Sequence, residues 1–113
     1  MITLPVKYIE LLARHGRDLK ELGVNGMALP RRPALEAVEA LRLAKIPILA
    51  THVLHVVNGK IRHSYDSWCC KSPVDTTSEE YMRESFAEAE RYIRAYPDSE
   101  NGTVFYEIGL PNH

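Results

Sequence analysis

The sequence predicts an α+β protein in which about three helices pack on one side of a twisted mixed sheet of about four strands. The clearest signal is a central β-hairpin, residues 48–57 and 60–68, because Asn58-Gly59 joins two strand-like runs and favours the positive φ angles of a two-residue turn. Apolar residues also recur at helical spacing in three other stretches. A strand at 27–29, a helix and the first hairpin strand follow one another, which indicates a right-handed crossover between two parallel strands.

Length and composition are typical of a folded protein. The 113 residues are 45% apolar and 26% charged, with a formal net charge of −1, so we expect a single domain over residues 1–113 that needs no metal or disulfide to be stable. The start does not resemble a signal peptide, and no apolar run approaches the length of a membrane span. We therefore expect a cytoplasmic protein with no membrane contact, no cofactor and no direct nucleic-acid partner.

Two helices are expected before the hairpin. The first runs from Pro5 to about His15, with Thr3 as its N-terminal cap, since proline suits the first turn of a helix. Residues 17–22 add a short helical turn. The second helix begins near Arg31 and ends before Ile46-Pro47, where the hairpin starts.

The third helix has the most regular apolar stripe of the chain. It is predicted to start at a capping box formed by Thr77 and Glu80, and to end near Ala95. A turn at Asn101-Gly102 then leads into a last strand over residues 103–108.

Pairing the hairpin outward from its turn separates two faces, because side chains alternate along a strand. The first face carries Ile48, Ala50, His52, Leu54, Val56, Ile61, His63 and Tyr65. The second carries Leu49, Thr51, Val53, His55, Val57, Lys60, Arg62, Ser64, Asp66 and Trp68. We expect the first face to meet the core, because Lys60 and Arg62 would be costly to bury unpaired. Asp66 and Trp68 would then lie on the wetter face.

Histidines and cysteines near the hairpin raise an enzymatic alternative. His52 and His63 share one predicted face and are weak candidates for a metal site, which would require further ligands. Cys69 or Cys70 could act as a nucleophile with one of the hairpin histidines (52, 55 or 63) as base. Buried, hydrogen-bonded histidines and inert buried thiols are far commoner, and the chain contains no known catalytic motif. We therefore expect no enzyme, and keep a small metal-assisted or thiol-dependent enzyme as the alternative.

Two surfaces are candidates for protein binding. The segment Tyr65-Asp66-Ser67-Trp68 concentrates the aromatic residue types that dominate binding energies at interfaces. The alternative for Trp68 is that it fills the core beside a β-bulge. A second candidate is the acidic face of the third helix, which consists of Glu80, Glu84 and Glu88.

Several short motifs resemble the bacterial immunity protein 40 family. They are GVN (23–25), ALEA (34–37), IPIL (46–49), NGKI (58–61) and YDSW (65–68), followed by Glu79-Glu80-Tyr81 and an amphipathic helix. The likeness covers about residues 20–96. It implies an α+β antidote from a polymorphic toxin system that binds the toxic domain of a cognate effector. On this hypothesis the toxin-binding residues are Tyr65, Asp66, Trp68, His55 and Arg62, with the acidic helix face as the alternative.

Overall fold

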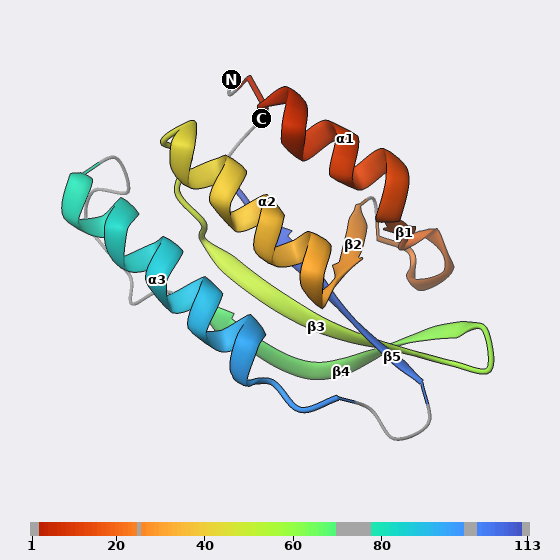
Figure 1. Ribbon diagram of the computed structural model, residues 1–113. Helices are drawn as coiled ribbons and strands as arrows, with labels where there is room; N and C mark the ends of the chain where they lie inside the picture. Colours follow the sequence, from red (N-terminus) through yellow and green to blue (C-terminus); the bar gives the residue numbers. More distant parts are fainter. Residues whose placement is uncertain (1–2, 25, 70–77, 99–101, 112–113) are drawn as a thin grey trace.

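The computed structural model describes residues 3–24, 26–69, 78–98 and 102–111, and within them three α-helices lie over a five-stranded sheet (Figure 1). The helices are α1 (Val6–His15), α2 (Arg31–Leu43) and α3 (Glu79–Ala95), with a 3-10 turn, η1, at Lys20–Leu22. The strands are β1 (Arg17–Asp18), β2 (Met27–Pro30), β3 (Ala50–Val57), β4 (Lys60–Cys69) and β5 (Thr103–Gly109). The predicted α+β class is confirmed.

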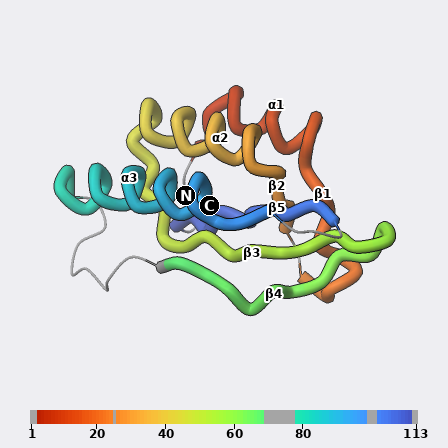
Figure 2. Tube along the Cα trace, turned by 60° about the horizontal axis from the view of Figure 1, so that its bottom comes forward, coloured from red at the N-terminus to blue at the C-terminus, as the bar shows by residue number. Residues whose placement is uncertain are grey.

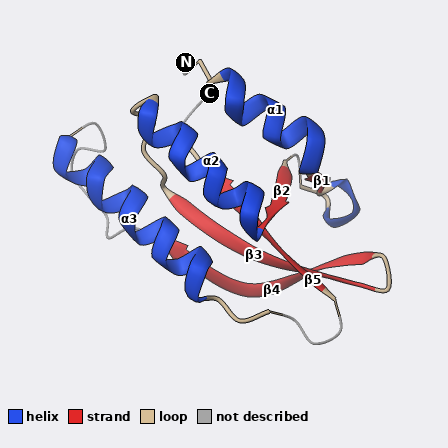
Figure 3. Ribbon diagram, in the orientation of Figure 1, coloured by secondary structure: helices blue, strands red, loops and turns tan. Residues whose placement is uncertain are grey.

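The sheet differs from the prediction in strand number and in direction. Its order is β1-β2-β5-β3-β4, and every neighbouring pair is antiparallel, so the sheet has five strands rather than about four and is not mixed (Figure 3). β2 and β3 do point the same way, since each is antiparallel to β5. They are not neighbours, because the last strand of the chain inserts between them. The helical crossover from β2 to β3 therefore passes over β5.

The three helices cover one face of the sheet and enclose the main core. In Figure 2 they form a single layer, with α2 between α1 and α3. Leu41 and Ile93 from the helices meet Ile48, Val53 and Tyr106 from the sheet side, and each of these five side chains is buried. This continuous apolar layer is what fixes the orientation of the hairpin.

A second, smaller cluster lies on the opposite face of the sheet. Leu19 and Ala28 pack there against Leu54 and Ile61 of the hairpin, and all four are buried. The segment that contains β1 and η1 reaches under the sheet to make this contact (Figure 2). Apolar hairpin residues are therefore buried on both faces, by different parts of the chain.

The helix caps differ from those predicted. Pro5, rather than Thr3, stands at the cap position of α1 and makes no side-chain cap bond. The cap of α3 is Ser78, whose Oγ accepts a hydrogen bond of 3.1 Å from the Tyr81 amide, one residue later than predicted. Thr77 itself lies outside the described residues. Ser78 is equally suited to the role, since its short hydroxyl reaches an amide of the first turn.

The predicted hairpin register is confirmed near the turn and wrong beyond it. Asn58 and Gly59 have φ angles of 53° and 79°, as the turn requires, and pairing runs from Val57↔Lys60 to Leu54↔His63. His52 then pairs with Ser67 rather than with residue 65. A β-bulge at residues 64–66 of β4 causes this shift of two residues.

The predicted facing of the hairpin also needs correction. Thr51 and Val53 are buried beneath the helices, and Trp68, opposite Thr51, is half-buried against the main core. His52 and His63 are exposed on the other face instead of being in the core. The prediction placed Trp68 on the strand face where it is found, but it wrongly assumed that this face is exposed to solvent. Because the helices cover the part of the hairpin remote from its turn, the cations near the turn stay exposed on the face that is buried further along.

Candidate functional site

Tyr65 is the most unusual residue of the hairpin. It lies in the bulge of β4 with a φ angle of 65°, and its side chain is 89% exposed. The left-handed backbone conformation costs a bulky residue about 1–2 kcal/mol, and such strain is enriched at functional sites. A large aromatic side chain that is both strained and solvent-exposed contributes little to folding. It is therefore the first candidate for binding.

Three hydrogen bonds hold the bulge in place. Ser64 Oγ donates to the Val53 carbonyl at 2.7 Å and accepts from the Asp66 amide at 3.0 Å. The Tyr96 hydroxyl donates to Asp66 Oδ2 at 2.5 Å. These bonds connect β4 to β3 on one side and to the C-terminal end of α3 on the other. They fix the backbone on both sides of Tyr65.

Tyr96 joins the bulge to the helix layer. Besides its bond to Asp66, its hydroxyl lies 3.4 Å from His55 Nε2, and the two rings meet edge to face at 6.2 Å. Partial burial and the hydrogen bond to Asp66 raise the pKa of Tyr96 to about 12. The carboxylate of Asp66 is thus engaged within the fold, which favours a supporting role over direct contact with a partner.

We expect Tyr96→Phe to destabilise the protein by about 1 kcal/mol at neutral pH, because it removes the hydrogen bond to Asp66. The pKa of Tyr96 rises from 10.0 to about 12 on folding, so the neutral phenol is favoured in the folded state. Its stabilising contribution is complete below pH 10 and is lost as the pH rises through 12. Urea unfolding of wild type and variant across this range should show the difference shrinking. Tyr92→Phe, one turn earlier, is the control, with a change within about 0.5 kcal/mol.

The open face of the sheet beside Tyr65 is hollowed. A depression of about 380 Å³ is lined by His52, Leu54, His63, Tyr65 and Glu107, among others. The centroids of the His63 and Tyr65 rings lie 5.6 Å apart, and His52 of β3 stands opposite Glu107 of β5 in the strand register. Aromatic and polar side chains thus surround Tyr65 and provide a surface on which a protein loop could rest.

The residues proposed for enzymatic chemistry do not converge. His52 and His63 lie on the open face, whereas His55 lies on the helix side opposite Arg62. Over the described part of the chain, no three His, Cys, Asp or Glu side chains are placed to hold one metal ion. Cys70 and the side chain of Cys69 lie outside what the structure describes, so the thiol alternative gains no support from the geometry.

The sequence-predicted binding residues lie along the hairpin and do not form one cluster. Tyr65 and Asp66 form the bulge. His55 and Arg62 stand opposite each other in the register of β3 and β4, on the helix side of the sheet. Trp68 is separated from them, because it packs against the core. On α3, Glu80 and Glu84 are exposed, and Glu88 pairs with Arg91 at 3.2 Å.

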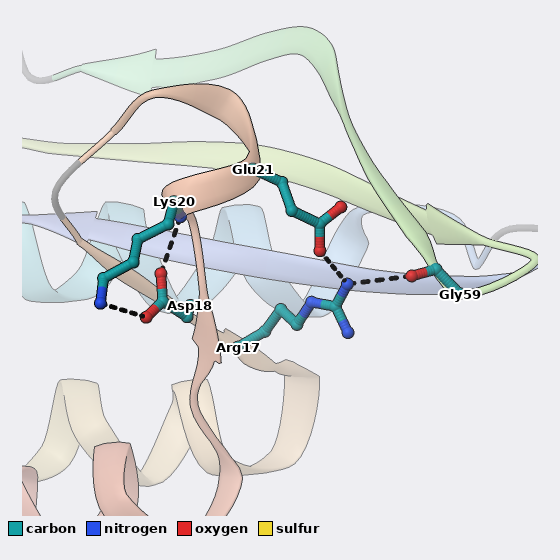
Figure 4. Close-up of polar contacts among 5 residues, drawn as sticks. All are labelled: Arg17, Asp18, Lys20, Glu21 and Gly59. Carbon is teal, nitrogen blue, oxygen red and sulfur yellow. Dashed lines mark hydrogen bonds and ion pairs between the residues drawn. The ribbon is translucent and has the colours of Figure 1, made fainter.

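Contacts that anchor the hairpin turn were missed by the sequence-based prediction. Figure 4 shows Arg17 of β1 donating to the Gly59 carbonyl at 2.9 Å and to Glu21 Oε1 at 2.6 Å. Next to it, Asp18 accepts from the Lys20 amide at 2.7 Å. Arg17 and Glu21 have the spacing of a helical ion pair, which was the only local signal; the contact with Gly59 spans 42 residues of chain.

Comparison with known families defines the class of this protein. The match is to a family of immunity proteins. The sequence model of the family described as Immunity protein 40 matches residues 18–110, and the chain therefore belongs to this family. The predicted resemblance is confirmed. A search of curated proteins gives no match. In the described residues, no helix has both the length and the apolar character needed to cross a membrane.

Proposed function

We propose that this protein binds the toxic domain of a cognate bacterial toxin in the cytoplasm and neutralises it by non-covalent inhibition. Membership of the Immunity protein 40 family supports the role. The observation that supports the site is Tyr65, which is 89% exposed at a bulge of β4. An aromatic anchor of this kind can fill a pocket on a partner at low cost in conformational entropy.

The surroundings of Tyr65 suit protein recognition. The bulge is fixed by Ser64 and by the bond between Tyr96 and Asp66, so the backbone carrying the anchor is rigid before binding. Preorganisation of this kind increases affinity, because less freedom is lost when the complex forms. His63 beside the ring and the adjoining hollow add contact area around it. Binding then inhibits the toxin because this chain covers the surface that carries the toxic activity.

The proposal is tested with the C-terminal domain of the protein encoded immediately upstream. We expect co-expression with this chain to restore growth of cells that produce the domain, and the two purified proteins to form a stoichiometric complex in size-exclusion chromatography. An unrelated toxin domain is the specificity control. Failure to protect cells, together with no complex at about 10 μM of each protein, would refute the proposal, since complexes of this kind typically bind far more tightly.

A further inference from the structure

The end of the hairpin projects past the ends of α2 and α3, as Figure 1 shows. We call residues 55–62 the hairpin arm. Its two faces differ, because one is covered by the segment that contains Leu19, which packs on Ile61. The other face, which we call the bare face, continues the helix side of the sheet past the ends of α2 and α3, and Tyr96 at the end of α3 contacts it at His55. This face carries His55, Val57, Lys60 and Arg62.

The bare face of the arm carries positive charge with no partner among the described residues. Lys60 and Arg62 are exposed, and within the described residues neither has a carboxylate at ion-pair distance. By contrast, Arg17 at the same end of the molecule pairs with Glu21 at 2.6 Å. Asp66, the next acid along β4, is bonded to Tyr96. Within the part of the chain that the structure describes, the two cations are therefore available to an external acidic group.

The shape of this face favours a protein surface. Lys60 and Arg62 line a shallow depression of about 480 Å³ together with Val57 and Asn58, so apolar and cationic contacts are combined. Arg17 holds the turn through the Gly59 carbonyl, which keeps the arm in position. Arginine binds carboxylates through two parallel hydrogen bonds, and unpaired surface cations accelerate association with an acidic partner.

Nucleic acid is a poorer fit for the same charges. The chain has 14 lysine and arginine residues against 15 aspartate and glutamate residues. Proteins that bind the phosphate backbone usually present an extended basic stripe, whereas here only two neighbouring cations are unpaired on the arm.

We propose that the bare face of the hairpin arm docks on an acidic surface of the toxin domain, with Arg62 and Lys60 pairing with its carboxylates. The proposal rests on the function proposed above and specifies the chemistry of the partner. The Tyr65 anchor lies on the opposite face of the hairpin, with His52 and His63, and the two faces meet at the outer edge of β4, the end strand of the sheet. A toxin domain that covers this edge would contact both, with the aromatic residue supplying buried contact and the cations supplying orientation and speed of association.

The test is a double charge reversal, Lys60→Glu with Arg62→Glu, measured against the upstream-encoded toxin domain by surface plasmon resonance. We expect the association rate constant at about 50 mM NaCl to fall at least tenfold, and most of its salt dependence up to about 300 mM to disappear. The matched control is Arg14→Glu with Arg32→Glu, two exposed cations on α1 and α2 that change the net charge equally. It should alter the rate less than threefold. Circular dichroism and thermal unfolding verify folding, and the milder double glutamine variant replaces the reversal if that fails to fold.

The outcomes separate the two proposals. If wild type binds and the arm variant retains the wild-type rate and salt dependence, the arm inference is wrong and the proposed function stands. If the control slows association as much as the arm variant, the effect reflects net charge and the arm inference is also wrong. If the wild type does not bind the domain, both proposals fail. Wild type and the arm variant are also titrated with single-stranded DNA and RNA, and we expect the arm cations to contribute no binding. If the wild type binds either nucleic acid and the arm variant does not, the partner of the arm is nucleic acid and the inference is wrong.

Discussion

Replacing Tyr65 with alanine is expected to weaken binding of the toxin domain at least 30-fold, because a central aromatic anchor is typically worth about 2 kcal/mol or more. Tyr65 is the most exposed large apolar side chain in the described residues, at 89%, so its loss removes contact area without opening a cavity in the fold. Isothermal titration calorimetry with the toxin domain measures the effect. Growth protection in cells should fall in parallel.

Tyr65→Gly separates binding from folding. Glycine adopts the left-handed conformation without strain, so this variant should be as stable as wild type or more stable by up to about 1 kcal/mol, and it should still bind weakly. Leu43→Ala serves as the surface control, since Leu43 is 71% exposed on α2, away from the bulge. Full affinity of a folded Tyr65→Ala variant would exclude the anchor and direct attention to the acidic face of α3.

Truncating Leu19 is expected to produce the largest loss of stability outside the main core. Leu19 is 1% exposed and packs against Leu54 and Ile61 in the second cluster, so Leu19→Ala should lower the free energy of unfolding by about 2–5 kcal/mol. Urea denaturation measures this quantity. Hydrogen exchange should also accelerate at the amides of the hairpin arm, because Leu19 covers one of its faces.

The same surface leucine is the control for this variant. Leu43→Ala removes an equal number of atoms from an exposed position and should change the free energy of unfolding by less than about 0.5 kcal/mol. Equal effects of the two substitutions would mean that the second cluster does not stabilise the hairpin.

Local signals were sufficient to predict the three helices and four of the five strands, but neither the two-residue β1 nor the order of the strands. Asn58-Gly59 determines its own turn, and apolar residues at helical spacing mark the helices, so these features could be located from short stretches of sequence. The insertion of β5 between β2 and β3 depends on pairing between distant segments, for which the chain has no short-range signal. β1 has only two residues, too few for a recognisable pattern.

The sequence predicted which residues belong to the candidate site, but it did not predict the backbone geometry that positions them. The stretch that contains Tyr65 and Asp66 stands out by its residue types, yet the bulge arises from Ser64 bonding to Val53 and from Tyr96 reaching Asp66 across 30 residues. A tyrosine in the sequence does not predict a positive φ angle, whereas a glycine or an asparagine often does. The error at Trp68 had a different origin, because alternation separates two faces without indicating which of them the helices will cover.

The bulge also affects how copies of this chain behave toward one another. β4 is the outermost strand on its side of the sheet and, at ten residues, would offer a long row of backbone groups to a strand of another molecule. The irregularity at residues 64–66 divides this row into two short parts and twists one away from the other. Edge-to-edge aggregation is thereby opposed by the same residues that present Tyr65 to solvent.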